Sequence, residues 1–581
     1  MKRIAPLQYY APFFTINCRP SDRSIGRKLL SSQSSWGQRR DDIDGDGRRW
    51  RVQRRVAVTG LGAITPLGHD MKSTWEGVLR TRGNPDDDLR HPPRGDGITS
   101  LYHALQQQDL SPAQFEKEWE MIRTSSCQVA ASVRNEWITN HPSVVADSSG
   151  DDPPPPWLDG RTARFVQLAL IAAREAIRDS GLDDYLGCDD RSSKRKTTTT
   201  TTTTTSQSIL EGRREAYGVC IGNGMSSTRD IAAAAAAAGS VRRISPHFVP
   251  RILPNSPSAR VAIHNRLRGP NLGHSEACAA GAAAVAQAVE LIRSGMATGM
   301  VAGGCEGAVE ALGLAGFGRL RALSANAGGG GGAGDDDDGQ RDEDGNNGRY
   351  HSTRASSRPF DSRRDGFVLA EGAAMLVLEE YEHAIARGAP ILAEVLGVGY
   401  SGDAFHITAP EPTGGGAARA MLRAVDDAGI GGMDDVDYVN AHATSTPMGD
   451  VAEINAIRLA LSRTAASGYE DGMPPPPPPP LLVSSTKGAT AHCLGAAGAL
   501  EAALTVRAVS EDTIPHTRNL DVISDDITLA LGQSTDDPTM PPRRSIHLVQ
   551  HGPVYRTVNF AMSNSFGFGG TNVSLLFGKA T

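Results

Sequence analysis

Cys278 has the sequence setting of a nucleophile. It stands where the polar run GHSE at 273–276 gives way to an alanine-rich stretch of helical composition. A thiol at a helix N-terminus lies at the positive end of the helix dipole, which lowers its pKa and favours the thiolate. We therefore expect Cys278 to react as a thiolate, with a buried structural cysteine as the alternative. Cys220 and Cys305 lie within or directly after expected strands and are expected to be core residues.

Two histidines have settings suited to hydrogen-bond donation. His442 ends the expected strand 436–443 and precedes the hydroxyls of Thr444 and Thr446. The C-terminal ends of strands are where α/β folds place their ligands. His492 stands at the expected start of a second alanine-rich helix, where the dipole disfavours the imidazolium and keeps the ring neutral. For either histidine taken alone, a purely structural role is the alternative.

The chain contains an internal repeat. The segment ACAAGAAA at 277–284 matches AHCLGAAG at 491–498 in register, and VLGVGYSGDA at 395–404 echoes VTGLGAITPL at 58–67. We therefore expect two strand-and-helix halves, in which the cysteine and the second histidine face each other near a pseudo-two-fold axis. Chance similarity between alanine-rich helices is the alternative.

Short β-rich runs alternate with helical stretches along the chain. A helix is expected over 163–181, because its apolar residues recur at helical spacing and it ends at a glycine. This alternation predicts an α/β protein with helices packed on its sheets. The expected strands are 56–65, 216–224, 299–304, 373–380, 391–400, 436–443, 481–487 and 557–565.

The glycine-rich loop FGFGG at 566–570 follows the last strand that the pattern predicts. Its glycines permit positive φ and close backbone approach, which suits an amide directed at an oxyanion. A phosphate-binding loop is disfavoured, because there is no GK[ST] ending and no helix is expected to follow. The GLG within 56–68 lacks the third glycine and the acidic residue of a dinucleotide-binding fingerprint.

Composition excludes several classes of protein. The net charge of 59 basic and 66 acidic residues is −7, and residues 1–40 hold eight Lys/Arg against one acid, which leaves −14 for the rest. Sequence-independent nucleic-acid binding is therefore not expected. The seven cysteines lack CxxC spacing, which argues against a disulfide framework or a zinc site. No uncharged apolar stretch of about 18 residues predicts a membrane span.

The remaining segments are not expected to belong to the core. Residues 1–50 are basic and nearly free of acids at their start, which indicates an organelle transit peptide, with a disordered tail as the alternative. Four low-complexity insertions are expected to form surface loops, because such compositions bury too little apolar area to offset their ordering entropy. They lie near 150–156, 191–208, 327–352 and 465–480.

Six ordered motifs resemble those of the β-ketoacyl-acyl-carrier-protein synthases of the chain-elongating (type I/II) class, which are thiolase-fold condensing enzymes. The resemblance runs from about Arg55 to the C-terminus. It implies a thiolase-like α/β fold of two pseudo-symmetric halves, 51–385 and 386–581, in a layered αβαβα arrangement. The motifs are RRVAVTGLGAITPLG (54–68), EACAAG (276–281), RPFDSRRDGFVLAEGAA (358–374), NAHATSTPMGD (440–450), STKGATAHCLGAAGALEA (485–502) and NSFGFGGTN (564–572).

The resemblance implies a role for each residue that matches a catalytic position. Cys278 is the acylated nucleophile, and His442 and His492 act on the malonyl unit. Phe568 gates the acyl pocket, and its backbone amide joins that of Cys278 in an oxyanion hole. The implied reaction is decarboxylative condensation of an acyl thioester with malonyl carrier in fatty-acid elongation.

The resemblance also implies supporting residues and partners. Lys487 and Glu501 match positions that hold the histidines, and Thr444 and Thr446 match hydroxyls near the malonyl carboxylate. The implied partners are acyl- and malonyl-loaded acyl carrier protein and a second copy of the chain. No metal or organic cofactor is implied, because decarboxylation drives the condensation.

Four positions depart from the family's usual pattern. Ala443 and Ala491 each replace a glycine beside a histidine, and Ala280 replaces a frequent Thr or Ser. Glu276 replaces a small residue two positions before the nucleophile and would oppose thiolate formation if it pointed inward. No departure removes a catalytic side chain, so we expect an active enzyme.

Related activities differ at identifiable positions. A thiolase would carry a second cysteine in the final glycine-rich loop, where Phe566 and Phe568 stand, and initiating enzymes usually have Asn in place of His492. Polyketide ketosynthases share the Cys-His-His set, but nothing here indicates additional catalytic domains. A non-catalytic chain-length partner subunit is the alternative from another class, and retention of the full set argues against it.

Assembly and location give the last two expectations. The strand 299–304 is apolar and lacks the Lys or Pro that protect an exposed sheet edge, so we expect it at the edge, paired with its mate in a homodimer. The basic N-terminus indicates the mitochondrial matrix, with a plastid as the alternative.

Overall fold

The chain forms two compact units, residues 1–53 and 54–581. In the first unit, β1 (Asp42–Ile43) pairs antiparallel with β2 (Arg49–Trp50). The computed structural model describes residues 42–43, 49–50, 54–80, 98–106, 108, 110–122, 127, 129–139, 161–187, 204–237, 239–325, 355–463, 479–532 and 544–580.

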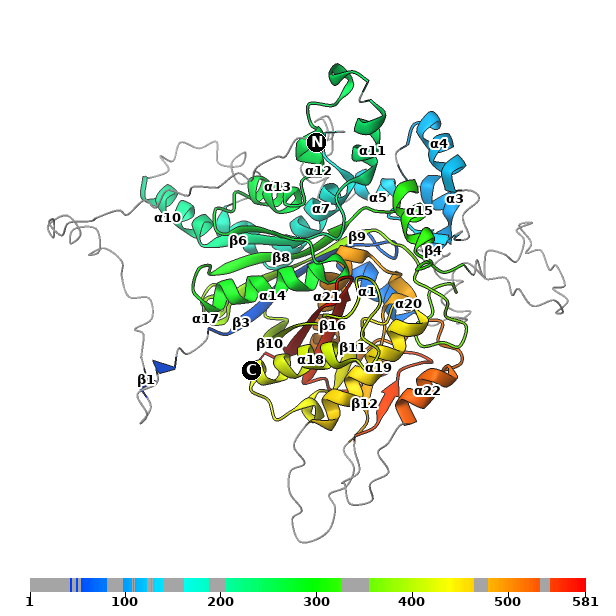
Figure 1. Cartoon of the computed structure of the whole chain (residues 1–581). Coiled ribbons are helices and arrows are strands. Elements are labelled where there is room, and N and C mark those ends of the chain that lie inside the picture. The colour runs from blue at the N-terminus through cyan, green and yellow to red at the C-terminus, as the bar shows by residue number, and fades with distance from the viewer. Residues whose placement is uncertain are drawn as a thin grey trace, which may run out of the picture. The chain divides into compact units, whose positions relative to one another are not determined.

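The second unit is built on two halves whose sheets have the same topology (Figure 1). Along the chain, the first strand of each half pairs antiparallel with the last strand of that half, and the last pairs antiparallel with the strand before it. The remaining pairs within each half of the main sheet are parallel. The N-terminal order is β3 (Val56–Ile64), β9 (Gly372–Glu380), β8 (Gly299–Glu306), β6 (Tyr217–Gly222), β7 (Asn271–His274). The C-terminal order is β10 (Ala393–Gly402), β17 (Thr571–Gly578), β16 (Phe560–Gly567), β11 (Tyr438–Asn440), β12 (Leu481–Ser484), followed by β14 (Ile546–Leu548).

Pairing of β3 with β10 joins the two halves. Both strands carry a bulge at the same place, between Val58 and Gly60 in β3 and between Val395 and Gly397 in β10. The glycines that follow each bulge let a helix carbonyl approach closely, because a Cβ at Gly60 or Gly397 would lie 2.4 or 1.9 Å from a helix carbonyl oxygen. The similarity between 58–67 and 395–404 is confirmed as structural, because the two segments form the first strand of their respective halves.

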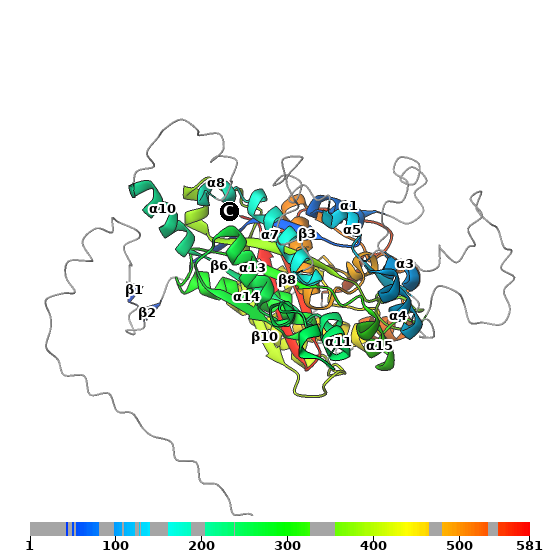
Figure 2. The same cartoon turned by 90° about the horizontal axis from the view of Figure 1, so that it is seen from above.

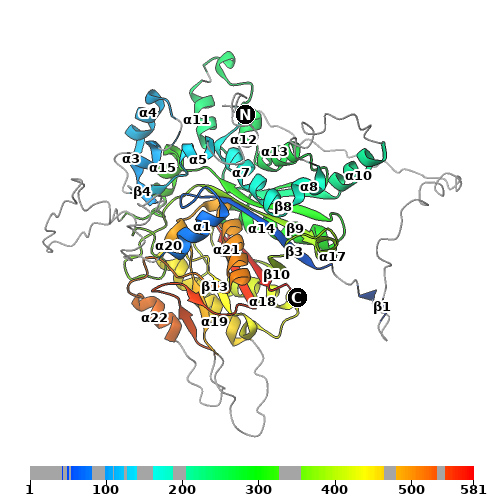
Figure 3. The ribbon, with the colours of Figure 1, turned by 180° about the vertical axis from the view of Figure 1, so that it is seen from behind.

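Helices and sheets form five layers. α7 (Arg164–Asp179) covers the outer face of the first sheet, and α18 (Gly415–Ala428) covers that of the second. α14 (Ala280–Arg293) and α21 (Ala497–Glu511) lie side by side between the sheets in the front and rear views (Figures 1 and 3). Small residues permit this contact, since a Cβ at Gly281 would lie 2.9 Å from the Ala499 backbone nitrogen. The αβαβα arrangement is confirmed.

The other described elements surround this core, and the view from above shows α3, α4 and α15 together beside it (Figure 2). The helices are α1 (Met71–Leu79), α3 (Leu101–Gln106), α4 (Pro112–Ile122), α5 (Asn135–Thr139), α8 (Leu182–Leu186), α10 (Thr204–Glu215), α11 (Thr228–Ala236), α12 (Phe248–Ile252), α13 (Ser256–Asn265), α15 (Ala311–Arg319), α17 (Tyr381–Ala386), α19 (Pro447–Ser462), α20 (Lys487–Thr490) and α22 (Asp525–Gly532). The remaining strands are β4 (Ile98–Ser100), β5 (Val129–Ala131), β13 (Thr513–Ile514) and β15 (Val554–Tyr555).

Several expectations about the elements are wrong. The strand over 299–304 is not at an edge, because β8 lies between β9 and β6, and β7 forms the N-terminal edge instead. β7 is only four residues long, and its sequence NLGH lacks a strand pattern. The expected last strand is followed by β17, which the glycine-rich loop joins to β16 as a hairpin.

Two expectations about the repeats and insertions also need correction. Cys278 is the second residue of the 3₁₀ turn Ala277–Ala279 before α14, and the equivalent second residue of Leu494–Ala496 before α21 is Gly495. The two repeats were therefore aligned three residues out of register, because the structural equivalent of Cys278 is Gly495 and not His492. Insertion 191–208 is partly helical, since α10 begins at Thr204. Insertions 150–156 and 327–352, and 465–478 of the last one, lie outside the described residues.

The described residues include five of the seven cysteines. Cys127, Cys220, Cys278, Cys305 and Cys493 are free and buried. This confirms the expected core positions of Cys220 and Cys305.

The described helices were also compared with the length and apolar composition that a membrane span needs. Among the described residues, none of them meets both requirements.

Candidate active site

Cys278 lies in a buried turn held between the two halves. Only 8% of the residue is exposed. The end of β16 presses against this turn, because a Cβ at Gly567 would lie 2.6 Å from the Glu276 carbonyl oxygen and 3.2 Å from the Ala279 nitrogen. A glycine is therefore required at 567, and the hairpin tip that follows it is brought beside the nucleophile.

The expectation of a lowered thiol pKa is wrong. Burial raises the pKa of Cys278 to about 12, because the ionised sulfur loses its hydration. The positive charge of Lys487 opposes this shift, whereas the nearby carboxylates of Glu306 and Glu501 add to it. The resting residue is a neutral thiol, and the position at a helix start is outweighed by desolvation.

This pKa predicts how Cys278 responds to pH. We expect its alkylation by iodoacetamide to rise roughly tenfold per pH unit between pH 7 and pH 10, because the thiolate fraction grows in that proportion below the pKa. The measurement is the alkylation rate of Cys278 followed by peptide mass spectrometry, with buried Cys220, whose pKa is also raised to about 12, as internal reference. A plateau near neutral pH would show a resting thiolate instead.

His492 contacts the nucleophile directly. Its Nε2 lies 3.1 Å from the Cys278 Sγ. Its backbone forms a parallel β-bridge with Leu369. The His492 N–H donates to the Val368 carbonyl at 2.9 Å, and the His492 carbonyl accepts from the Ala370 N–H at 3.0 Å. His492 precedes the turn before α21, so the expected position at a helix start is wrong, although the expected contact with Cys278 is confirmed.

His442 lies opposite, after the end of β11. The two histidine rings are 5.6 Å apart at 85°, and Phe566 lies 5.6 Å from the His442 ring. The Glu453 carboxylate accepts the backbone N–H groups of His442 and Ala443 at 2.9 and 2.7 Å. Sequence reasoning missed Glu453, because an acid on a helix such as α19 has no local signal that separates a buried acceptor from a surface charge.

Both imidazoles are neutral donors. Burial and the charge of Lys487 lower the pKa of His442 and of His492 well below the usual value. In each ring, Nδ1 is buried without a hydrogen-bond partner among the described residues. An orphaned buried N–H costs more than an orphaned lone pair, so the proton belongs on Nε2. Nε2–H of His492 then faces the sulfur.

Lys487 and Glu501 form a fully buried ion pair. Burial raises the pKa of Glu501 above its ordinary value, and the ammonium of Lys487 draws it back. Lys487 lies close enough to influence the pKa of Cys278, His442 and His492, and Glu501 influences that of Cys278. Its location agrees with the supporting role implied by the resemblance, with Lys487 acting by charge.

Ala491 explains why glycine is usual before the second histidine. Its backbone has φ 57° and ψ −165°, a region almost confined to glycine. The conformation is imposed by hydrogen bonds on both sides, from the Ala491 N–H to the Lys487 carbonyl at 3.0 Å and from the Thr490 Oγ1 to the Ala491 carbonyl at 2.9 Å. An alanine at position 491 therefore strains the backbone by about 1–3 kcal/mol relative to glycine. Ala443 has no positive φ and accommodates its methyl group without this cost.

Glu276 does not point at the nucleophile. Its Oε1 lies 3.0 Å from the His274 Nδ1, and this contact lowers the pKa of the carboxyl against the effect of burial. The negative charge is thus directed away, toward the edge strand β7. The remaining matched hydroxyls are in place, with Thr444 Oγ1 3.2 Å from Thr446 Oγ1.

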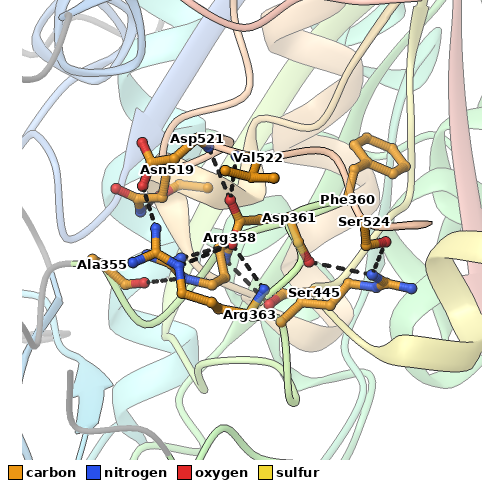
Figure 4. Close-up of polar contacts among 12 residues, drawn as sticks. Ala355, Arg358, Phe360, Asp361, Arg363, Ser445, Asn519, Asp521, Val522 and Ser524 are labelled. Carbon is orange, nitrogen blue, oxygen red and sulfur yellow. Dashed lines mark hydrogen bonds and ion pairs between the residues drawn. The ribbon is translucent and has the colours of Figure 1, made fainter. Parts of the chain in front are cut away.

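The first part of the motif 358–374 supports the loop that follows His442, whereas Phe367, Val368 and Ala370 contact His492. The Arg358 N–H donates to the Ser445 Oγ at 3.1 Å, and the Arg358 guanidinium pairs with the buried Asp361 at 2.7 Å. Figure 4 shows Asp361 between Arg358 and the backbone of Asp521 and Val522, whose N–H groups donate to it at 2.9 and 3.0 Å. This cluster fixes the loop that follows His442.

Cys278 and the two histidines line one cavity of about 340 Å³. It is lined by Cys278, His442, His492, Thr444, Thr446 and Phe568, together with Phe317 and Phe367, which stack edge to face at 5.5 Å. Lys487 and Glu501 lie behind this surface. Among the described residues, no cluster of His, Cys, Asp or Glu is arranged to hold a metal ion. The arrangement offers a nucleophile, two N–H donors and an apolar channel in one space.

Known proteins share this architecture. Residues 53–384 match "Beta-ketoacyl synthase, N-terminal domain" and residues 392–521 match "Beta-ketoacyl synthase, C-terminal domain". The mitochondrial 3-oxoacyl-[acyl-carrier-protein] synthase of Arabidopsis thaliana is 37% identical over 533 residues, 91% of this chain and 94% of that protein. The 3-oxoacyl-[acyl-carrier-protein] synthase 2 of Vibrio harveyi is 35% identical over 91% of this chain and 99% of its own length.

Solved structures agree with the fold. A β-ketoacyl synthase from Burkholderia phymatum STM815 has a TM-score of 0.63 at 26% identity, over 91% of this chain and 100% of that one. The ketosynthase of the AntDE:AntF complex, which is solved with its acyl-carrier protein, has a TM-score of 0.63 at 22% identity, over 91% of this chain and 100% of that one, and shows the fold alone. Because both domains are matched and the relatives are spanned almost completely, this chain belongs to the β-ketoacyl synthase family.

Proposed function

We propose that this chain is a 3-oxoacyl-[acyl-carrier-protein] synthase that condenses an acyl group on Cys278 with malonyl carrier in fatty-acid elongation. The observation that carries the proposal is the meeting of Cys278 and His492 at 3.1 Å in the cavity that also holds His442. The relatives named above carry this activity in their names. Purified chain supplied with acyl and malonyl carrier tests the proposal, by release of one CO2 per carrier product lengthened by two carbons.

The first half-reaction transfers the acyl group to the enzyme. The Cys278 sulfur attacks the thioester carbonyl, its proton ends on the departing carrier thiol, and the charge of Lys487 lowers the cost of the developing thiolate. The backbone amides of Cys278 and Phe568 would stabilise the tetrahedral oxyanion. Gly567 supports this assignment, because it packs against the turn that holds Cys278 and directly precedes Phe568, and Cys278 and Phe568 line the same cavity.

The second half-reaction forms the carbon–carbon bond. Nε2–H groups of His442 and His492 donate to the malonyl thioester oxygen, so that loss of CO2 leaves a stabilised enolate. The enolate carbon attacks the acyl carbonyl on Cys278, the carbon–sulfur bond breaks, and the departing thiolate takes a proton from solvent water. Neutral imidazoles suit this step because each arrives as a donor without having to lose a charge.

The non-catalytic alternative is tested by the acyl-enzyme itself. A chain-length partner subunit would present the fold without acylation, and one similar structure is a ketosynthase with a chain length factor, at 26% identity and a TM-score of 0.61. Mass spectrometry of a Cys278 peptide carrying the acyl group from acyl carrier supports the enzyme. A protein that never acquires the acyl group would contradict it. Acyl carrier protein is accordingly the proposed partner.

We also propose a homodimer, formed through β7 instead of the strand expected from the sequence. β7 is the edge of the N-terminal half-sheet, and Leu272 on it is 37% exposed. Exposed Val249, Leu253 and Ile263 come from the neighbouring helices α12 and α13 and the turn after α12. Pairing of two β7 strands would continue the sheet and cover these side chains.

Leu272→Asp is expected to dissociate the dimer at micromolar concentration, because two carboxylates would be buried about the two-fold axis. Sedimentation velocity measures the effect. Leu529→Asp is the control, since this exposed leucine lies on α22 in the other half. An intact dimer of the Leu272 variant would place the interface elsewhere.

Localisation in the mitochondrial matrix is proposed from the N-terminal residues. Its supports are the basic, acid-poor residues 1–40 and the mitochondrial name of the Arabidopsis relative. Residues 1–50 fused to a fluorescent reporter are expected to direct it to mitochondria. The control is the same fusion with the eight Lys/Arg of residues 1–40 changed to Gln. Plastid fluorescence would favour the alternative, and cytosolic fluorescence would contradict the transit peptide.

A further inference from the structure

Glu306 occupies the two-fold equivalent of the catalytic hairpin. β8 and β16 are equivalent strands, since Glu306 at the end of β8 is opposite the first residue of β9, and Gly567 at the end of β16 is opposite the first residue of β17. The residues after them, Gly307 and Phe568, are equivalent in turn. Cys278 is likewise equivalent to Gly495, because each is the second residue of the turn that opens a central helix.

The two equivalent places are filled differently. At the end of β16, Gly567 has no side chain and packs against the turn that holds Cys278, beside the proposed oxyanion hole. At the end of β8, the equivalent residue Glu306 carries a carboxylate. It accepts the N–H groups of Gly224 at 3.0 Å, Gly307 at 3.2 Å and Gly495 at 3.3 Å.

This carboxylate joins the two halves next to the catalytic groups. The Gly224 and Gly495 backbones touch, since a Cβ at Gly495 would lie 1.9 Å from the Gly224 nitrogen. Three buried N–H groups converge there, and each would lose this acceptor if the Glu306 carboxylate were removed. Glu306 is 1% exposed and lines a small cavity of about 50 Å³. Burial raises the pKa of Glu306 to about 7 against the effect of these N–H groups, and the ionised form opposes ionisation of Cys278.

We propose that Glu306 is a positioning residue for the condensation step, acting as a built-in oxyanion that fixes the turn beginning two residues after His492. This inference rests on the proposed function. Through Gly495, the carboxylate holds the turn that orients the His492 ring toward Cys278. Loss of that hold affects the enolate formed from malonyl carrier more than the acylation of the sulfur, because a donor must be aligned with the oxygen where charge develops.

Glu306→Gln tests the inference in the full-length chain. The amide keeps one oxygen but turns an N–H₂ group toward N–H donors. We expect elongation and malonyl decarboxylation to fall about tenfold or more, while acylation of Cys278 stays within about threefold. Iodoacetamide should alkylate Cys278 severalfold faster, because the opposing charge is gone. Glu310→Gln is the control, since this buried acid accepts the Arg229 N–H and does not touch Gly495.

Glu306→Asp separates the hydrogen bonds from the charge. It retracts the carboxylate by one methylene, so elongation should fall as in the Gln variant while alkylation stays slow. Glu306→Asp also serves as the test variant if the Gln variant does not fold. Elongation within about twofold of wild type in either variant overturns the inference. So does an equal fall of acylation and elongation together with a lower melting temperature, which would mark a purely structural residue. Absence of elongation in the wild type would contradict the proposed function instead.

Discussion

Cys278→Ala is expected to lower elongation by on the order of 10⁴-fold or more, while malonyl carrier still releases CO2. Among the described residues that line the cavity, Cys278 is the one thiol, so the alanine removes the proposed carrier of the acyl chain. His442, His492 and Lys487 remain, so the donors that stabilise the malonyl enolate are intact. The variant should fold, because a buried sulfur with a single polar contact is replaced by a smaller apolar side chain.

Separate assays distinguish the two half-reactions. Acyl transfer is followed by mass spectrometry of the protein, decarboxylation by CO2 release from malonyl carrier, and elongation by product length. Cys220→Ala is the matched control, because Cys220 is buried and its pKa is also raised to about 12, yet it lies outside the cavity lining. Elongation by the Cys278 variant at the wild-type rate would remove this residue from the mechanism.

His442→Ala and His492→Ala should produce the opposite pattern. Each deletes one donor to the enolate, worth roughly 3 kcal/mol, so elongation and decarboxylation should fall about a hundredfold or more. Acylation of Cys278 should persist in both variants. It should be weaker for His492→Ala, because only His492 contacts the sulfur, at 3.1 Å.

A third histidine provides the control for both variants. His516→Ala removes a buried imidazole whose pKa is lowered to about 4 by burial and by Arg518, but which does not line the cavity. It should leave the ratio of acylation to elongation unchanged. If His442→Ala or His492→Ala condensed normally, that histidine would be structural and the two-donor description of the enolate step would be wrong.

The residues alone predicted an α/β protein of two similar halves, because that information is local and repeated, and the family resemblance implied how the layers are arranged. Bulge and glycine positions in 58–67 recur in 395–404, and the structure places both as first strands under a close helix. The motifs around Cys278, His442 and His492 name the three residues that the cavity brings together. Strand patterns, glycine spacing and short motifs are read within about ten residues, so they survive without knowledge of what packs against them.

Tertiary structure decided what depends on burial and on distant neighbours. β8 looked like an edge strand, but β6 covers it from 82 residues earlier in the chain. Cys278 looked like a thiolate, yet desolvation by both halves outweighs the helix start. Glu453 and Glu306 gave no signal, because a buried carboxylate is defined by the backbone N–H groups that converge on it. Those groups come from other strands and turns, and only folding brings them within hydrogen-bond distance.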